Sequence, residues 1–201
     1  MASTILYLVR HGRTMANLEG RFAGRTDEPL IEEGVEQARA AGRFLAHEAI
    51  KAIYTSPMLR TVQTATIMAG FSGAGVIQDE GLAEINIPHW DGRLKNDLMQ
   101  DNSSRYPLWK QAPERFYMKG AEGLKDVMER ARRCVEKIMA SYQGGSVAAV
   151  THLAVMRCLI LFYTSRPLSD YRKVGAENAD PLALIHKDDQ IYIGNLSVGG
   201  C

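Results

Sequence analysis

Three things are scarce in this chain: cysteine, unbroken apolar sequence and an excess of either charge. Among the 201 residues there are three cysteines, Cys134, Cys158 and Cys201, which are scattered and lack the spacing of a metal site. Scattered free thiols are typical of a reducing compartment, so we expect the protein in the cytoplasm.

The apolar runs are too short to target or cross a membrane. Residues 5–9 are too few for the core of a signal peptide, and Arg10 follows them directly. The longest later run, residues 153–163, carries Arg157 and is too short to span a bilayer. We therefore expect no membrane partner.

The charge is nearly balanced. The chain has 24 Lys and Arg residues and 23 Asp and Glu residues, interspersed along its length, for a formal net charge of +1. Such a balance gives no positive field that would attract nucleic acid, so we expect no nucleic-acid partner. Any attraction for an anion must be local.

Strand and helix patterns alternate along the chain, which predicts an α/β fold. We expect three layers, with a mainly parallel central sheet flanked by helices, in a single domain of residues 1–201. Apolar runs predict strands at 5–9, 52–56, 76–79 and 146–152 and a final hairpin of 181–186 and 190–194. Helical spacing and composition predict helices at 30–49, 57–70, 124–142 and 153–163. Residues 86–123 have weak periodicity and several turn signals, and are interpreted as an irregular insertion over one face of the sheet.

Basic side chains follow three of the predicted strands. Arg10 and His11 come directly after the first strand. Arg60 lies early in the helix after the second, and His152 ends a later strand. If these strands are parallel neighbours, the four side chains meet at the sheet edge where ligands bind in open α/β sheets. Each residue alone is more often solvated or structural, but the repetition at three junctions predicts a site for a tetrahedral anion.

Two features make this edge suitable for phosphate. A guanidinium fork matches phosphate oxygens and stays ionised. Ser56 and Pro57 suit the cap and the first position of the helix that carries Arg60. The first turn of that helix would then add backbone N–H groups and the positive end of a dipole.

Two stretches around these residues resemble signatures of the histidine phosphatase, or phosphoglycerate mutase-like, superfamily. Residues 8–17, LVRHGRTMAN, are similar to its Arg-His-Gly motif, and residues 54–65, YTSPMLRTVQTA, to its Ser-Pro-x-x-Arg-x-x-Gln-Thr-Ala motif. Further matches stand in the family's order at 21–38, 82–92, 120–131 and 149–157. The ordered set covers almost the whole chain and is most similar to compact bacterial phosphatases, including α-ribazole phosphatase and broad-specificity types.

The resemblance implies a catalytic role for five residues. His11 would be the nucleophile, Arg10, Arg60 and His152 the phosphate ligands, and Glu84 the proton donor. Attack by neutral His11 would form a phosphohistidine and split one displacement into two. Its other ring nitrogen would donate to a backbone carbonyl in the tight turn that follows. The two arginines and a protonated His152 would stabilise the transition state.

The resemblance also implies which residues contact the substrate. Asn17 and the backbone of Ala23 and Gly24 lie where relatives touch phosphate or substrate. The substrate would be a small phosphate ester, with no metal or organic cofactor. The sequence carries no HExxH, CxxC or Walker pattern.

At four positions the chain departs from the family's pattern. Leu153 replaces the usual glycine after His152 and is expected to shift the following helix or narrow the pocket. Ile31 replaces the threonine that usually caps the first helix, at a cost of about 1 kcal/mol. Asp180 stands where many relatives have a small hydroxyl residue, and would oppose anion binding if it lies near the site. His89 is either a pocket residue or solvated.

Substrate identity is expected to depend on the insertion 86–123, which would lie over the active site. Its aromatic residues would either stack on a substrate ring or fill a small core of their own; they are Trp90, Tyr106, Trp109, Phe116 and Tyr117. Its basic residues would either hold a second anion or be solvated; they are Lys95, Arg105, Lys110, Arg115 and Lys119.

The short chain lacks the longer insertion and the tyrosine-containing motif expected of a phosphoglycerate mutase. It is therefore predicted to be a cofactor-independent phosphomonoesterase of the histidine acid phosphatase type, acting on a small phosphorylated metabolite. Two alternatives stay open: mutase-type phosphoryl transfer, and a weakly active member that binds phosphorylated ligands or partners. A protein phosphatase is less favoured, because the insertion would cover the site. The sequence leaves the substrate and the oligomeric state open.

Overall fold

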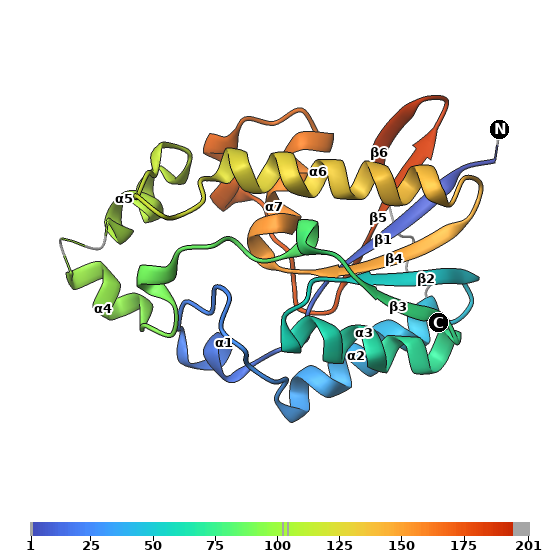
Figure 1. Cartoon of the computed structure of the whole chain (residues 1–201), viewed down its shortest axis with the longest axis horizontal. Helices are drawn as coiled ribbons and strands as arrows, with labels where there is room; N and C mark the ends of the chain where they lie inside the picture. Colours follow the sequence, from blue (N-terminus) through green and yellow to red (C-terminus); the bar gives the residue numbers. More distant parts are fainter. Residues whose placement is uncertain (1, 102, 104, 195–201) are drawn as a thin grey trace.

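A six-stranded sheet lies at the centre of the computed structural model, which describes residues 2–101, 103 and 105–194 (Figure 1). The strand order is β3-β2-β4-β1-β5-β6. Strands β3, β2, β4 and β1 pair in parallel in that order. Strand β5 pairs antiparallel with β1 and forms the predicted final hairpin with β6. The strands are β1 (Thr4–Arg10), β2 (Ile50–Thr55), β3 (Gly75–Gln78), β4 (Ser146–Thr151), β5 (Pro181–Lys187) and β6 (Gln190–Gly194).

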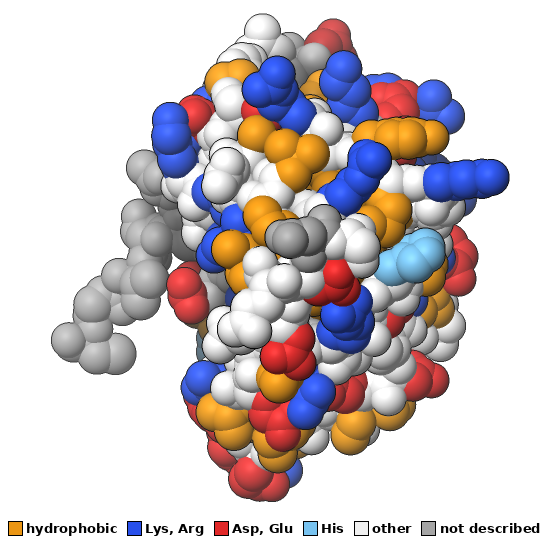
Figure 2. Space-filling model, turned by 90° about the vertical axis from the view of Figure 1, so that its left-hand side faces the viewer, with side chains coloured by type: hydrophobic (Ala, Val, Ile, Leu, Met, Phe, Trp, Pro, Cys, Tyr) orange, Lys and Arg blue, Asp and Glu red, His pale blue; other side chains and the backbone are white. Residues whose placement is uncertain are grey.

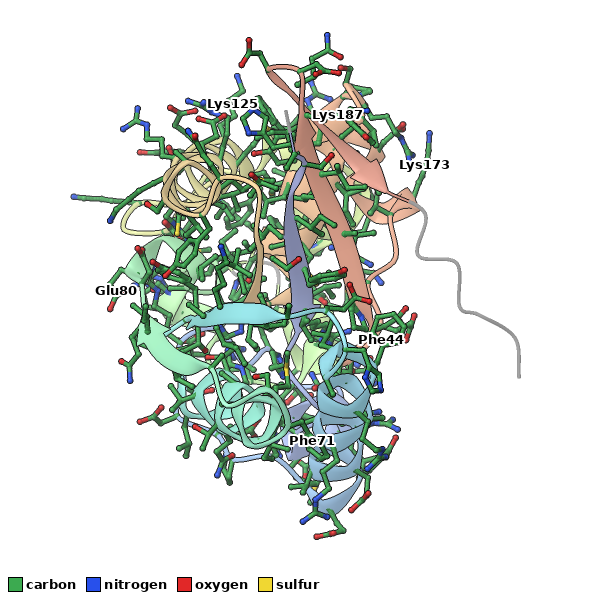
Figure 3. The ribbon with its side chains drawn as sticks, turned by 90° about the vertical axis from the view of Figure 1, so that its right-hand side faces the viewer. Phe44, Phe71, Glu80, Lys125, Lys173 and Lys187 are labelled. Carbon is green, nitrogen blue, oxygen red and sulfur yellow. The ribbon has the colours of Figure 1, made fainter. Side chains whose placement is uncertain are left out.

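Two pairs of helices cover the sheet and make the three predicted layers. α2 (Glu32–Leu45) and α3 (Leu59–Ser72) pack on one face, and α6 (Leu124–Ser141) and α7 (Leu153–Tyr163) pack on the other. The end view in Figure 3 shows the same layers, with Phe71 marking the first pair of helices. The α/β fold class is therefore confirmed.

Strand β1 is apolar throughout because both faces of the sheet are covered. Leu6 and Leu8 belong to the core on the α6 and α7 side, whereas Tyr7 and Val9 belong to the core on the α2 and α3 side. Side chains alternate between the two faces of a strand, so β1 is anchored in both cores. The residues that follow it are consequently held in place from both sides.

Helix α2 is shorter than predicted, because residues 46–49 form a turn that leads into β2. Its N-cap is Ile31, whose side chain makes no capping hydrogen bond. The N-terminus of α2 therefore lacks the side-chain cap that a threonine would supply, as expected from Ile31. The sequence pattern does not predict the one-turn helix α1 (Met15–Glu19), because five residues are too few for a helical period to be recognised.

Helix α3 begins at Leu59 rather than at Pro57, so the prediction of Ser56 as its cap is wrong. The Ser56 hydroxyl is engaged elsewhere, 2.8 Å from Nε2 of His152. The backbone N–H of Leu59 donates to Oδ1 of Asp27 at 3.2 Å. Asp27 thus accepts the hydrogen bond of a backbone N–H group that the sequence predicts as a donor to the anion.

The insertion forms short helical turns at the end of the sheet where β1 and β4 finish (Figure 1). They are η2 (Pro88–Trp90), α4 (Lys95–Gln100), α5 (Tyr106–Gln111) and η4 (Pro113–Arg115). Long helical periodicity is absent because none of these elements exceeds two turns, which explains the weak sequence signal.

Four of the five insertion aromatics are buried against one another. Trp90, Tyr106, Trp109 and Phe116 are between 0 and 6% exposed, with ring centroids 4.8–5.8 Å apart in each contacting pair. Tyr117 is 70% exposed. The buried four are continuous with the core under α6 and α7. The expectation of a separate small core is therefore wrong, because the insertion shares the main core.

Cys134 and Cys158 are buried free thiols, and Cys201 lies outside the described residues. Within the described ranges, no helix combines the length and the apolar character needed to cross a membrane.

The turn after β1 packs backbone against backbone on α2, and two glycines permit this. A Cβ on Gly34 would lie 2.2 Å from the carbonyl oxygen of Arg13, and one on Gly12 would lie 2.3 Å from that of Gly34. We expect Gly34→Ala to lower the free energy of unfolding by about 2 kcal/mol, because the backbone must move to relieve the overlap. Urea denaturation measures this change.

Gly70→Ala is the matched control for that substitution. Gly70 also lies inside a helix, α3, but no atom lies within 4 Å of its Cβ position. Because alanine is the better helix former, this variant should be more stable by about 0.5–1 kcal/mol. Equal effects of the two substitutions would show that close packing at Gly34 does not matter.

Candidate active site

His11 follows β1 directly and is fixed on both its backbone and its ring. Its backbone N–H donates to the carbonyl of Thr151 at the end of β4 (2.9 Å), and its carbonyl accepts from Nδ2 of Asn178 (2.7 Å). The ring Nδ1 lies 2.7 Å from the carbonyl oxygen of Gly12 and must donate to it. The proton on Nδ1 leaves a lone pair on Nε2, the nitrogen that could attack an electrophile.

His11 is 4% exposed, and its surroundings favour the uncharged imidazole. Burial, followed by the nearby charges of Arg60 and Arg10, lowers the pKa of His11 well below its ordinary value. A nucleophilic imidazole must be neutral, so these surroundings keep His11 in its reactive form even on the acid side of neutrality.

His152 lies beside His11, with their ring centroids 5.3 Å apart. It ends β4 and is the N-cap of α7, and the leucine that follows it lines the pocket without displacing it. Burial, and then the charge of Arg60, lower the pKa of His152 well below its ordinary value. These surroundings favour neutral His152, so its predicted protonated form needs a nearby negative charge that raises its pKa.

Arg10 and Arg60 are held by backbone carbonyls rather than by carboxylates. Nη1 of Arg10 donates to Ala176 (2.9 Å). Arg60, which is 1% exposed, donates from Nη1 to Thr26 (2.7 Å) and from Nη2 to Gly24 (2.6 Å). Burial lowers the pKa of both arginines. The carbonyls fix the guanidinium planes while leaving their positive charge uncompensated.

Three buried nitrogens of these residues have no hydrogen-bond partner among the described residues: Arg10 Nε, Arg60 Nε and His152 Nδ1. An unpartnered buried polar group costs about 1–3 kcal/mol, so native structures rarely keep one without a reason. An anion with several acceptor oxygens would satisfy all three, and a tetrahedral phosphate has the required number of oxygens.

Glu84 lies on the pocket wall after η1 (Glu80–Leu82). Its Oε1 accepts from the backbone N–H of Ile85 at 2.8 Å. Burial raises the pKa of the Glu84 carboxyl, and the backbone N–H of Ile85 and the charges of Arg60 and Arg10 oppose that rise only in part. A carboxyl with a raised pKa can hold a proton near neutrality and release it again, as a general acid and base must.

Arg130 of α6 braces the segment that carries this acid. It donates to the carbonyls of Gly81 (3.1 Å) and Glu84 (3.2 Å) and pairs with Glu122 (2.8 Å). Sequence reasoning missed this role of Arg130, although the residue lies within the 120–131 match and could have been found from it.

All the predicted site residues except His152 line one pocket, which offers about 120 Å³ to water-sized groups. The predicted residues that line it are Arg10, His11, Asn17, Ala23, Gly24, Arg60 and Glu84. Four further basic residues line the same pocket: Arg21, Lys95, Arg157 and Arg172. Among them the sequence pointed only to Lys95, as a candidate for binding a second anion.

His89 and Asp180 are exposed and do not line this pocket. His89 is thus solvated, and Asp180 does not face the phosphate-binding residues. Across residues 2–101, 103 and 105–194, no three His, Cys, Asp or Glu side chains are grouped as metal ligands would be.

A model of the histidine phosphatase superfamily (branch 1) matches residues 6–197. The chain belongs to this superfamily. It is 29% identical over 185 residues to phosphoserine phosphatase 1 of Hydrogenobacter thermophilus, covering 92% of this chain and 87% of that protein. It is 28% identical over 183 residues to a probable phosphoglycerate mutase, GpmB, of Serratia proteamaculans, covering 90% of this chain and 85% of the relative.

Among solved structures, the chain is similar to YhfR of Bacillus stearothermophilus, with a TM-score of 0.90 and 30% identity. The match covers 94% of this chain and 95% of that one. The chain spans less than half the length of several other curated relatives. The relatives of this chain thus include a phosphatase and a probable mutase, so its chemistry must be argued from its own pocket.

Proposed function

We propose that this protein is a phosphomonoesterase that hydrolyses small phosphate esters through a phosphohistidine at His11. The three unpartnered nitrogens of Arg10, Arg60 and His152 carry the proposal: both arginines line the pocket with His11, the His152 ring lies 5.3 Å from that of His11, and an anion with several oxygens could accept from all three. A phosphate dianion would also raise the pKa of His152, which would then take up a proton from solvent and bind the anion as a cation.

In the first step, Nε2 of neutral His11 attacks phosphorus, so an N–P bond forms while the P–O bond to the leaving group breaks. Glu84 donates its proton to the leaving oxygen, which departs as an alcohol. Charge builds up on the equatorial oxygens of the phosphoryl group, where Arg10 and Arg60 are already held by their carbonyl contacts.

In the second step, water attacks the phosphoryl group and the N–P bond breaks. Ionised Glu84 takes a proton from the attacking water, which returns the carboxyl to its starting form. The electron pair of the broken bond returns to Nε2 of His11, and inorganic phosphate leaves.

Mutase chemistry is the second candidate, supported by the similarity to a probable phosphoglycerate mutase. A mutase must keep water from the phosphohistidine and return the phosphoryl group to the organic substrate. A non-catalytic phosphate-binding role is the third candidate, which Leu153 and Asp180 suggest as departures from the family's pattern. Against it, His152 lies beside His11 and Asp180 does not line the pocket. We favour hydrolysis, because the tyrosine-containing motif expected around the acid of a mutase is missing, and a cytoplasmic location, because Cys134 and Cys158 are free thiols.

Turnover of p-nitrophenyl phosphate in the presence of EDTA tests the proposal. We expect metal-independent release of p-nitrophenol and phosphate, faster on the acid side, because burial lowers the pKa of His11 and raises that of Glu84. A parallel assay follows the interconversion of 2- and 3-phosphoglycerate. Isomerisation faster than hydrolysis would favour the mutase, and phosphate binding without either reaction would favour the binding protein.

A further inference from the structure

Besides Arg21, which pairs with Glu19, three cations line the pocket beyond the phosphate-binding residues: Lys95, Arg157 and Arg172. In the described part of the chain, none of them has a carboxylate within 4.0 Å. The pocket lining as a whole holds six Lys and Arg side chains, whereas Glu84 is its only acidic residue in the described chain. One phosphate dianion cannot neutralise this excess of positive charge.

Arg157 and Arg172 are held by the protein rather than free in solvent. Nε of Arg157 donates to the carbonyl of Val174 (2.7 Å), and Nη2 of Arg172 donates to that of Trp109 (2.9 Å). Both guanidinium groups lie against the ring of Tyr171, with Cζ 5.1 Å and 5.7 Å from its centroid. Tyr171 is 3% exposed and so provides a fixed surface for the two forks.

These cations lie near the phosphate-binding residues, because they line the same pocket as Arg10 and Arg60. Burial, followed by the charges of Arg10 and Arg172, lowers the pKa of Lys95. Lys95 therefore connects the two groups of cations. On the face that carries the insertion, Lys and Arg side chains lie among apolar ones over the upper part of the surface (Figure 2).

We propose that Arg157 and Arg172, with Lys95, form a second anion subsite that selects short-chain phosphate esters carrying a carboxylate a few bonds from the phosphate. The inference rests on the proposed function. Two planar forks that line the same pocket match a carboxylate, and each keeps N–H groups beyond the one bound to its carbonyl. The apolar wall of Phe22, Ile85 and Leu153 would contact the carbon chain between the two anions.

Matched substrate pairs isolate the carboxylate. O-phosphoserine is compared with O-phosphoethanolamine, and 3-phosphoglycerate with glycerol 3-phosphate, because the members of each pair differ in the carboxylate. We expect the carboxylated ester to have a kcat/KM at least about tenfold higher, mainly through a lower KM. A charge-assisted hydrogen bond corresponds to about 10- to 100-fold in binding.

Arg157→Gln and Arg172→Gln should each reduce that preference toward one. Arg172 is exposed, so its variant keeps the test valid if Arg157→Gln fails to fold. Arg157→Lys keeps the charge and should restore part of the preference. Arg133→Gln is the matched control, because Arg133 lies on the exposed face of α6 and its side chain is 73% exposed; it should change neither rate nor preference.

The outcomes separate the two proposals. Equal kcat/KM within both pairs, together with good turnover of p-nitrophenyl phosphate, would overturn the subsite and leave the phosphomonoesterase intact. No turnover of any ester would overturn the proposed function itself. A stronger preference for fructose 1,6-bisphosphate over fructose 6-phosphate, lost in the arginine variants, would overturn the assignment of the second anion as a carboxylate.

Discussion

His11→Ala is expected to lower kcat for every phosphate ester on the order of 10⁴-fold or more, with the fold retained. The nucleophile is the only group that forms a covalent bond in the proposed reaction, and loss of a nucleophile leaves only binding and charge stabilisation. Steady-state hydrolysis of p-nitrophenyl phosphate measures the loss. Urea denaturation of the variant checks that it is folded.

Two further measurements make this expectation specific. Rapid mixing with substrate, followed by mass spectrometry without acid, should detect phosphate on His11 in the parent protein and none in the variant. His89→Ala is the matched control, because His89 is exposed and lies outside the pocket, and it should retain full activity. Activity that survives His11→Ala would mean that a different nucleophile carries the reaction.

The phosphate-binding part of the site can be predicted from the sequence because its residues follow strong local patterns. β1 and β4 are apolar on both faces, and Arg10, His11 and His152 come directly at or after their ends. In a parallel sheet these ends meet, so strand recognition alone brings the side chains together. Only the strand order, with β4 between β2 and β1, requires the structure.

The second group of cations cannot be predicted in this way. Arg157 interrupts an apolar helix, and Arg172 lies in η5 (Leu168–Lys173), a 3-10 segment without a usable period. They become neighbours only because both pack on Tyr171. Arg105 is the opposite case. The sequence suggests it as a residue that binds a second anion, but its Nη1 donates to the carbonyl of Tyr117.

Two aromatic residues of the insertion both pack in the core and line the pocket. The insertion's aromatics were expected either to contact substrate or to fill a core. Tyr106 and Trp109 are at most 4% exposed and belong to the core, yet both also line the pocket. A large aromatic ring has two faces and an edge, so it can be packed on one side and form a pocket wall on the other.

Glu84→Gln is expected to lower kcat/KM for alkyl phosphate esters by about 10²- to 10⁴-fold, because glutamine cannot protonate the leaving oxygen. The loss should be smaller for p-nitrophenyl phosphate, since p-nitrophenolate is stable without a proton. Glutamine also cannot take a proton from water, so the phosphohistidine should accumulate. A burst of p-nitrophenol equal to the enzyme concentration, followed by slow turnover, would be the kinetic sign of that accumulation.

The pH profile tests the same residue through its pKa. Burial raises the pKa of Glu84. The acid form needed in the first step is therefore fully present below that raised pKa and is lost as the pH rises through it. The kcat/KM of the parent protein for alkyl esters should fall on this alkaline side, and the fall should be absent from Glu84→Gln.

Glu80→Gln is the matched control for Glu84→Gln, because Glu80 lies in the same segment but its side chain is 74% exposed and points into solvent (Figure 3). This variant should keep both the rate and the pH profile of the parent. If Glu84→Gln also kept them, the proton donor would be a different group, and the raised pKa of Glu84 would reflect its burial alone. A burst without an alkaline fall would instead assign Glu84 to the activation of water and leave protonation of the leaving group to another residue.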